Sequence, residues 1–250
     1  NETAPEETRV PMLKERAAKP APAPEEAASE EVAQVEVAQA DTTKPGDTDA
    51  KKTDADGGED TSSETNEEKE DIGNGWFTAS DKRAQGNKQV DLKDGTMRIY
   101  IHEVADHAVS VKHEAGFQNG VVEARFNLEN PDDELGFNFA DMTFKEVHAG
   151  HLFKVVIDKN KIAITDLKTG IMDRKIRDQR KAGELPAKVT KMLKTKTKSF
   201  PVKIENNQWH SIAITVKGNT ASVTLDGKEI GNFSSEGIAH PTKGLLRLSV

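Results

Sequence analysis

The chain has 250 residues, of which 43 are acidic and 35 are basic, so its formal net charge is −8. It contains no cysteine, and no segment approaches the roughly 18 consecutive apolar residues that a membrane-spanning helix needs. These features exclude a disulfide scaffold, a thiolate metal site, a catalytic thiol and a membrane-spanning helix.

The first 72 residues differ sharply in composition from the rest of the chain. They carry 21 acidic and 8 basic residues, six of the ten prolines, and none of the 12 aromatic residues. Such a segment cannot bury enough apolar surface to offset roughly 1–2 kcal/mol per residue of backbone ordering. We therefore expect residues 1–72 to form a disordered acidic tail. It acts either as a solvated spacer, which is the commoner role of acidic segments, or as a segment that folds back on a basic patch.

The remaining residues, 73–250, show a hydrophobic pattern with a period of two, which is typical of strands with one buried face. The alternation is clearest at residues 97–101, 121–128, 135–140, 162–164, 212–216 and 223–225. Residues that tolerate positive φ separate these segments, as at Asp226-Gly227. We predict an all-β domain over residues 73–250, an antiparallel β-sandwich of the jelly-roll type.

A group of polar residues in the middle of the domain is the best candidate for chemistry. Glu146 and His148 are two residues apart, so on a strand they would share one face, and His151 would turn back through the intervening Ala-Gly. Imidazole and carboxylate together suit general acid–base catalysis or a divalent cation, and Asn138 and Asp141 would add oxygen ligands. The alternative is that both histidines are structural, because clustered polar residues mark sites only in some cases.

One segment, residues 171–194, has helical composition and is interrupted by Gly183-Glu184-Leu185-Pro186, which predicts a short helical hairpin inserted between strands. Residues 171–198 carry ten basic and three acidic residues. This charge either forms a solvated outer face or attracts an anionic polymer, a lipid headgroup or the acidic tail. No aromatic residue interrupts the basic run before Phe200, which argues against nucleic-acid binding.

The most diagnostic stretch is residues 207–231, where Trp209 opens one strand, a short turn follows, and the next strand ends in Leu225-Asp226-Gly227. This hairpin resembles the paired strands of the concanavalin A-like lectin/glucanase superfamily, and most closely the bacterial 3-keto-disaccharide hydrolase domains. The resemblance implies an exported jelly roll, located in the periplasm or outside the cell, that handles carbohydrate. The Tyr-Glu-x-Gln run common in that family is absent here, as is the Glu-x-Asp-x-x-Glu strand of retaining glucanases, so no catalytic residue is carried over.

The loop before the last strand supplies a second pair of candidates. His240 and Lys243 follow Gly237-Ile238 and flank Pro241, so they lie either at the rim of a concave face or in a rigid connector between strands. Residues 245–250 read as a strand, and the chain stops within it. We expect a further strand to follow in the parent protein. The chain starts at Asn1, so we expect either that a signal peptide has been removed from that end or that the chain is a fragment.

Three functions follow from these observations. The first is a tethered, exported domain that binds a glycan on its concave sheet. The second is a hydrolase or lyase of modified sugars, in which Glu146, His148 and His151 act with or without a metal ion. The third is a structural interaction module whose basic helical hairpin binds a partner. The small number of aromatic residues argues against tight glycan binding, because sugars usually stack on aromatic rings.

Overall fold

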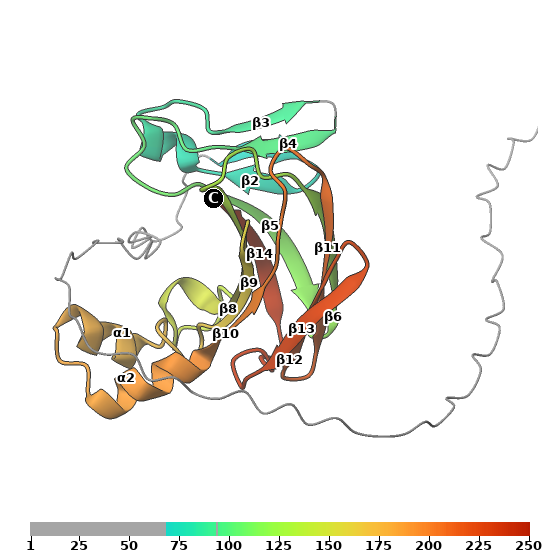
Figure 1. The fold of residues 1–250 in the computed structure, drawn as a ribbon. Helices are drawn as coiled ribbons and strands as arrows, with labels where there is room; N and C mark the ends of the chain where they lie inside the picture. Colours follow the sequence, from blue (N-terminus) through green and yellow to red (C-terminus); the bar gives the residue numbers. More distant parts are fainter. Residues whose placement is uncertain (1–68, 94) are drawn as a thin grey trace, which may run out of the picture. The chain divides into compact units, whose positions relative to one another are not determined.

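The computed structural model describes residues 69–93 and 95–250 (Figure 1). The predicted acidic tail lies outside the described residues except for its last four. Three of those four belong to the first strand, β1 (Glu70–Gly73), which therefore straddles the predicted domain boundary at residue 72. No helix among the described residues is both long and apolar enough to cross a membrane.

The described chain folds into two packed antiparallel sheets, as the alternating pattern predicts. The larger sheet has eight strands in the order β1-β2-β5-β14-β7-β8-β9-β10, and the smaller has four in the order β13-β12-β11-β6. The strands of the larger sheet after β1 are β2 (Trp76–Thr78), β5 (Ser110–Phe117), β14 (Lys243–Ser249), β7 (Glu134–Ala140), β8 (His151–Asp158), β9 (Lys161–Asp166) and β10 (Thr197–Pro201). Those of the smaller sheet are β13 (Lys228–Ser234), β12 (Thr220–Leu225), β11 (His210–Lys217) and β6 (Gly120–Phe126).

The hydrophobic core lies between these two sheets. Phe137 and Phe139 of β7 and Ile212 and Ile214 of β11 are all buried, and each pair is separated by one residue that points the other way. The ring of Phe139 stacks on that of Phe153, with centroids 4.3 Å apart. The alternation of apolar and polar residues in the sequence therefore identifies correctly which side chains of both sheets point into the core. The fold is the predicted all-β jelly-roll sandwich.

The additions to the sandwich lie near two ends of the larger sheet (Figure 1). At one end is the hairpin of β3 (Val90–Lys93) and β4 (Thr96–Ile99), preceded by a 3-10 helix, η1 (Ser80–Ala84). Near the other end is the predicted helical hairpin, made of α1 (Arg174–Lys181), α2 (Ala187–Leu193) and the 3-10 turn η3 (Lys194–Lys196). Asp173 caps α1 by accepting a hydrogen bond from the backbone N–H of Ile176 at 3.0 Å.

Candidate functional site

The face of the larger sheet that is turned away from the core carries a row of polar side chains. Arg247 of β14 pairs with Lys112 of β5 on one side and with Asn138 of β7 on the other. Asn138 in turn pairs with Lys154 of β8. Directly paired residues point to the same side of a sheet, so these four side chains lie next to one another across four strands.

The neighbouring row on the same face is made of small residues. Ser249 pairs with Ser110 on one side and with Gly136 on the other. A Cβ atom at Gly136 would lie 2.5 Å from Oγ of Ser249, so glycine allows the two strands to present an almost flat surface there. The small row leaves open space beside the polar row.

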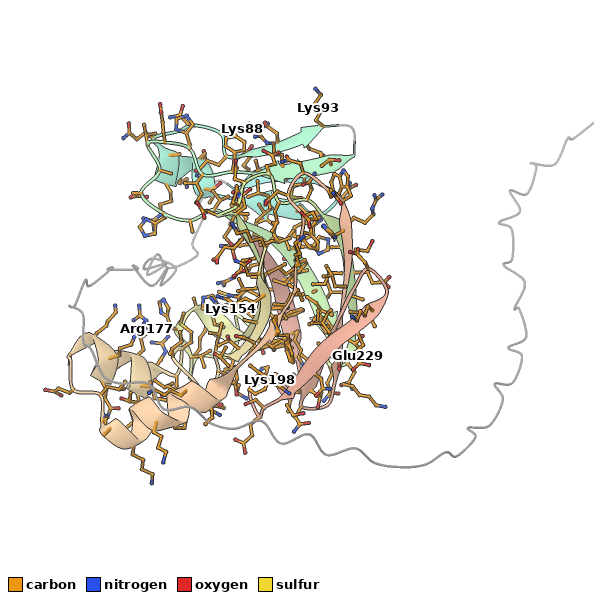
Figure 2. All side chains as sticks on the ribbon, viewed as in Figure 1. Lys88, Lys93, Lys154, Arg177, Lys198 and Glu229 are labelled. Carbon is orange, nitrogen blue, oxygen red and sulfur yellow. The ribbon has the colours of Figure 1, made fainter. Side chains whose placement is uncertain are left out.

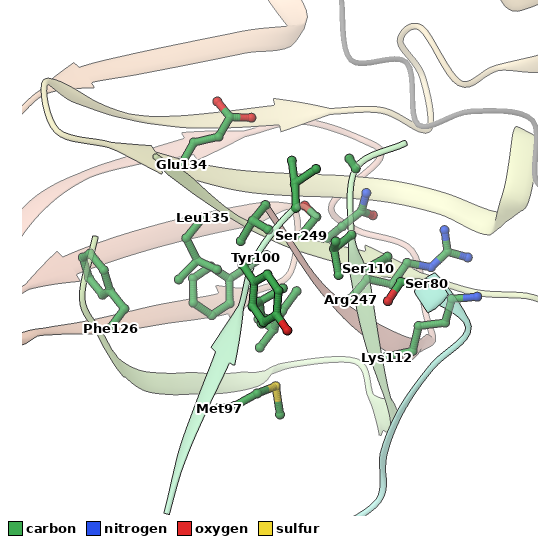
Figure 3. A pocket seen from close by; sticks show the side chains of 18 of the residues that line it. Ser80, Met97, Tyr100, Ser110, Lys112, Phe126, Glu134, Leu135, Arg247 and Ser249 are labelled. Atoms are coloured by element: carbon green, nitrogen blue, oxygen red, sulfur yellow. The ribbon is translucent and has the colours of Figure 1, made fainter. Parts of the chain in front are cut away.

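This face forms the floor of a cleft of about 2180 Å³. Figure 3 shows Lys112 and Arg247 at one side of the cleft and Leu135 and Phe126 at the other, with Tyr100 between them. Tyr100 follows β4, so the β3–β4 hairpin supplies one wall. Both tryptophans of the chain also line the cleft, and 49% of the surface of Trp209 is exposed.

His151 is the first residue of β8, and both nitrogens of its ring have a hydrogen-bonding partner. Its Nδ1 lies 3.0 Å from Oδ1 of Asn138, and its Nε2 lies 3.3 Å from Nη1 of Arg247. Burial and the neighbouring Arg247 guanidinium lower the pKa of the His151 imidazole well below its usual value. The ring is therefore neutral, with Nδ1–H donating to Asn138 and the Nε2 lone pair accepting from Arg247. Arg247 also donates to the carbonyl oxygen of Ala149 at 2.9 Å.

The structure separates the other two members of the predicted catalytic group. The strand predicted around Glu146 and His148 is wrong, because a 3-10 turn, η2 (His148–Gly150), begins there with Ala149 in the left-handed region. His148 is buried and lines the cleft, with its ring centroid 6.5 Å from that of His151. Glu146 is exposed and is not among the residues that line the cleft. Because the chain changes direction at this turn, Glu146 and His148 do not lie on one face of a strand.

The remaining predicted residues form a second cluster. His240 is buried, with its Nε2 3.0 Å from Oδ2 of Asp141 and its Nδ1 3.1 Å from Nζ of Lys168. Asp141 also accepts hydrogen bonds from the backbone N–H and hydroxyl of Thr143. Lys243 is fully buried and donates to two backbone carbonyls, those of Gln118 and His240. These contacts tie the loop after β7 to the loop before β14, which favours the rigid-connector interpretation of residues 240–243.

The ionisation of this second cluster follows from its burial. Burial would raise the pKa of Asp141, but hydrogen bonds from Thr143 and His240 outweigh it and lower that pKa. Burial and the charge of Lys168 lower the pKa of Lys243 to about 8. Neither group lines the cleft. Asn138 and Asp141, which were predicted to act together, therefore belong to two different clusters.

A divalent cation, one of the two options that the sequence left open for these residues, finds no ligand set among the described residues. Among residues 69–93 and 95–250, no three His, Asp or Glu side chains converge so that they could hold a metal ion. His151 already uses both ring nitrogens, and Asp141 uses both carboxylate oxygens. The imidazole and carboxylate groups serve as hydrogen-bonding partners of neighbouring side chains instead.

The sequence interpretation missed the cationic residues of the cleft, Lys112, Lys154 and Arg247, and the aromatic Tyr100. Lys154 and Arg247 each interrupt an apolar run within a strand, residues 152–157 of β8 and residues 245–248 of β14, and both are preceded and followed by residues that pack in the core. A charge at the outward position of such a strand marks the face that is exposed to solvent or ligand. That signal was present, but it does not indicate which strands lie side by side.

Comparisons with known proteins give only remote structural likeness. No protein-family model matches the chain, and no curated protein matches it. The chain is similar in fold to "carbohydrate binding module CBM66 from Bacillus subtilis", with 10% identity, 70% of this chain and 87% of that chain covered, and a TM-score of 0.45. It is also similar to a Bacillus licheniformis beta-glucanase, with 14% identity, 72% of this chain and 80% of that chain covered, and a TM-score of 0.47. For sheep galectin-11, solved in complex with glycerol, the identity is 14%, the match covers 55% of this chain and 86% of that chain, and the TM-score is 0.38.

These neighbours are concanavalin A-like jelly-roll folds, the class that the Trp209 hairpin resembles. The narrower resemblance to 3-keto-disaccharide hydrolase domains stays a prediction. The functional interpretation below depends on the side chains of the cleft and not on these remote likenesses.

Proposed function

We propose that the protein is a carbohydrate-binding module that holds a glycan in the cleft on the polar face of its larger sheet. The observation that carries this proposal is the pairing of two adjacent rows. One is a row of hydrogen-bonding side chains, Lys112, Arg247, Asn138 and Lys154, and the other is a row of small residues that leaves space for a ligand. Sugars present many hydroxyl groups together with apolar ring faces, so they need convergent polar groups and a flat surface.

The aromatic residues of the cleft supply the apolar part of this recognition. Tyr100 stands over the floor between the cationic side and the apolar side of the cleft (Figure 3). Trp209 also lines the cleft and is half exposed. The domain has few aromatic residues in all, yet its only tyrosine and both tryptophans line this cleft. Their placement offsets the objection that the composition raised against glycan binding.

The geometry favours binding over catalysis. A general base needs a lone pair aimed at the substrate, but the Nε2 lone pair of His151 accepts from Arg247. The Asp141–His240 pair is buried outside the cleft, and Glu146 does not line it. The hydrolase or lyase alternative therefore retains His148 and His151 in the cleft but has no carboxylate among its predicted residues there. The export of the protein and the binding of a partner by the helical hairpin stay predictions.

Tryptophan fluorescence tests the proposal directly, because Trp76 and Trp209 both line the cleft. The full chain is titrated with a panel of neutral and acidic oligosaccharides, and at least one should change the emission in a saturable manner. Ser249→Tyr would fill the floor of the cleft without changing its charge and should abolish that response. Ser234→Tyr, on the exposed end of β13, is the matched control and should retain it.

A second pair of variants examines the aromatic contact. Tyr100→Ala should weaken binding by about tenfold, because a stacking contact contributes roughly 0.5–1.5 kcal/mol beyond the apolar area it buries. Tyr100→Phe keeps the ring and should bind nearly as the wild type does. The proposal fails if no oligosaccharide gives a saturable change, or if Ser249→Tyr binds as tightly as the wild type.

A further inference from the structure

We infer that the glycan held in this cleft is acidic, carrying carboxylate or sulfate groups, and that its anionic groups lie along the row formed by Lys112, Arg247 and Lys154. This inference rests on the proposed function, because it names the class of carbohydrate for the same site. Four features of the described residues support it: the strand register, the distribution of charge in the cleft, the fixed orientation of Arg247, and the continuation of positive charge onto α1.

The strand register places like charges side by side. Lys112 and Arg247 pair directly across β5 and β14, and only Asn138 separates Arg247 from Lys154. Cross-strand neighbours have Cβ atoms about 4.5–5.5 Å apart, and like charges directly opposite one another destabilise a sheet. The row continues through Thr165 and Thr197 on one side and through Phe77 to Asp71 on the other, so no acidic residue lies between Lys112 and Thr197. An anion lying along the row would relieve this repulsion.

The rest of the cleft shows the same imbalance of charge. Eight lysine and arginine residues line it, against four acidic residues. All four acidic residues lie in one short segment, 129–134, between β6 and the start of β7. One of them, Glu129, is paired with Arg98 at 2.7 Å, and another, Asp133, accepts hydrogen bonds from the backbone N–H groups of Glu129 and Asn130. Glu129 and Asp133 are therefore engaged at the wall of the cleft. Glu134, the first residue of β7, lies on the sheet face four residues before Asn138, so the row itself stays positive while the end of the face beyond the small row carries a carboxylate.

Arg247 is held in a fixed orientation. Only 7% of its surface is exposed, and its guanidinium contacts His151, the carbonyl oxygen of Ala149 and the sulfur of Met142. Because His151 is neutral, it fixes the guanidinium without adding a charge. A planar guanidinium with a set orientation suits the two oxygens of a carboxylate or sulfate. The ammonium groups of Lys112 and Lys154 belong to the same row, one on either side of Arg247.

The positive surface continues from the sheet onto the helical hairpin. Arg180 of α1 lines the cleft together with Ile171 and Met172 at the start of the insertion. Figure 2 shows Lys154 and Arg177 on the same side of the larger sheet. Arg177 is itself buried and does not line the cleft, so Arg180 carries this continuation. A chain of several acidic sugars, rather than a single sugar, would reach from the β5–β14 side of the row to α1.

The test compares ligands of matched length on the full chain by isothermal titration calorimetry. The probes are hexamers of galacturonate, a hexasaccharide of heparin type, cellohexaose and laminarihexaose, and a polyglutamate of equal charge. We expect at least one acidic hexamer to bind at least tenfold more tightly than both neutral hexamers and polyglutamate. Whether galacturonate or the sulfated probe binds more tightly identifies the anionic group. Binding should weaken as salt increases, since salt screens exposed charges.

Paired variants locate the site. Lys154→Gln should weaken binding of the acidic hexamer by about tenfold, the effect of losing one charged hydrogen bond. Lys217→Gln makes the same change of charge at the exposed end of β11 and should leave binding unchanged. Lys112→Gln is a second variant within the row and should behave as Lys154→Gln does.

The outcomes separate this inference from the function on which it rests. Equal or tighter binding of a neutral hexamer would overturn the acidic class and leave carbohydrate binding intact. Equal binding of polyglutamate would show a surface that selects charge alone, which also overturns the inference. A lack of binding by every oligosaccharide would overturn both proposals. An acidic preference that Lys154→Gln and Lys217→Gln reduce equally would exclude the row as its site.

Discussion

Arg247 donates a hydrogen bond to Nε2 of His151 across 3.3 Å, from the last strand of the chain to the first residue of β8. The two residues are 96 positions apart in the sequence, and the contact joins strands on either side of β7. Burial, and after it the charge of Arg247, keeps His151 neutral, and the contact holds the Arg247 guanidinium in place at the cleft. The contact changes the role of His151 from the predicted acid–base residue to a residue that positions a cation.

The neutral state of His151 predicts how stability depends on pH. Its pKa is lowered in the folded protein, so the unfolded chain binds more protons below the ordinary histidine value of about 6.5. Stability from this group is therefore fully present above that value and is lost as the pH falls toward the folded-state pKa. We expect wild type to lose more unfolding free energy between pH 7 and pH 5 than His151→Gln does, with a limiting slope of about 1.4 kcal/mol per pH unit.

Urea unfolding at several pH values measures this difference. An NMR titration of the imidazole supplies an independent readout and should show the Nδ1–H tautomer. Parallel stability curves for wild type and His151→Gln, or an imidazole that titrates near pH 6.5, would contradict the assignment.

We expect the carboxylate of Asp166 to make a large contribution to the free energy of unfolding. It is fully buried and accepts hydrogen bonds from Thr169, from the hydroxyl of Ser235 and from the backbone N–H of Gly237. Burial would raise its pKa, but these hydrogen bonds, first among them that of Ser235, outweigh burial and lower it. Asp166→Asn turns one acceptor into a donor that faces donors, and should cost about 3 kcal/mol of unfolding free energy at pH 7.

The matched control for this prediction is Asp158→Asn at the opposite end of the β8–β9 hairpin. Asp158 accepts from two backbone N–H groups but is partly exposed, so we expect a cost of about 1 kcal/mol. Because the pKa of Asp166 is lowered, its contribution is present above the unfolded value of about 3.9 and is lost in more acidic solution. The difference between wild type and Asp166→Asn should shrink below about pH 4. Equal costs for the two variants at pH 7 would show that burial of Asp166 is unimportant.

The η2 turn offers a pair of adjacent substitutions with opposite expected signs. Gly150 has φ of +68°, and a Cβ there would lie within contact distance of the backbone of Asp141, which cannot move aside. Gly150→Ala should therefore lower the unfolding free energy by at least about 2 kcal/mol. Ala149 has φ of +47°, which costs a non-glycine residue about 1–2 kcal/mol, so Ala149→Gly should be neutral or slightly stabilising. Thermal unfolding of both variants checks the signs, and a stabilising Gly150→Ala would contradict this geometry.

The buried ammonium of Lys243 predicts a gain of stability in alkaline solution. Its pKa is about 8 in the folded protein and 10.5 as the ordinary value, so the unfolded chain binds more protons between these two values. Unfolding free energy from this group therefore rises as the pH increases from about 8 to 10.5. Lys243→Met should lack this rise, whatever its absolute stability. Unfolding curves at pH 8, 9 and 10 that stay parallel for the two proteins would refute the prediction.

Much of the fold was predictable because its determinants are local. Alternation along 135–140 and 212–216 identified strands and their inward residues, since successive side chains of a strand point to opposite faces. The break at 183–186 divided the insertion into two helices, because Gly183 adopts positive φ just after α1 and Pro186 precedes α2 as its N-cap residue. These signals depend only on near neighbours in the sequence.

The candidate site was predictable only in part. Asn138, His148 and His151 do line the cleft, whereas Glu146 does not and Asp141 joins His240. The 3-10 turn at 148–150 and the bulge between Phe139 and Ala140 alter which way nearby residues point. A single irregular residue reverses the facing of those that follow it, and a pattern of period two does not reveal where such a residue falls.

The amino-acid sequence by itself determined a two-layer β domain with a helical insertion, preceded by a segment of different composition. Only the tertiary structure decided that β14, the last strand, enters the larger sheet between β5 and β7. That placement brings Lys112, Arg247, Asn138 and Lys154 into one row, although they are spread over residues 112–247. Strand order is set by pairing between distant segments, and no local pattern encodes it, so the cleft and its charge emerge only when the sheet is assembled.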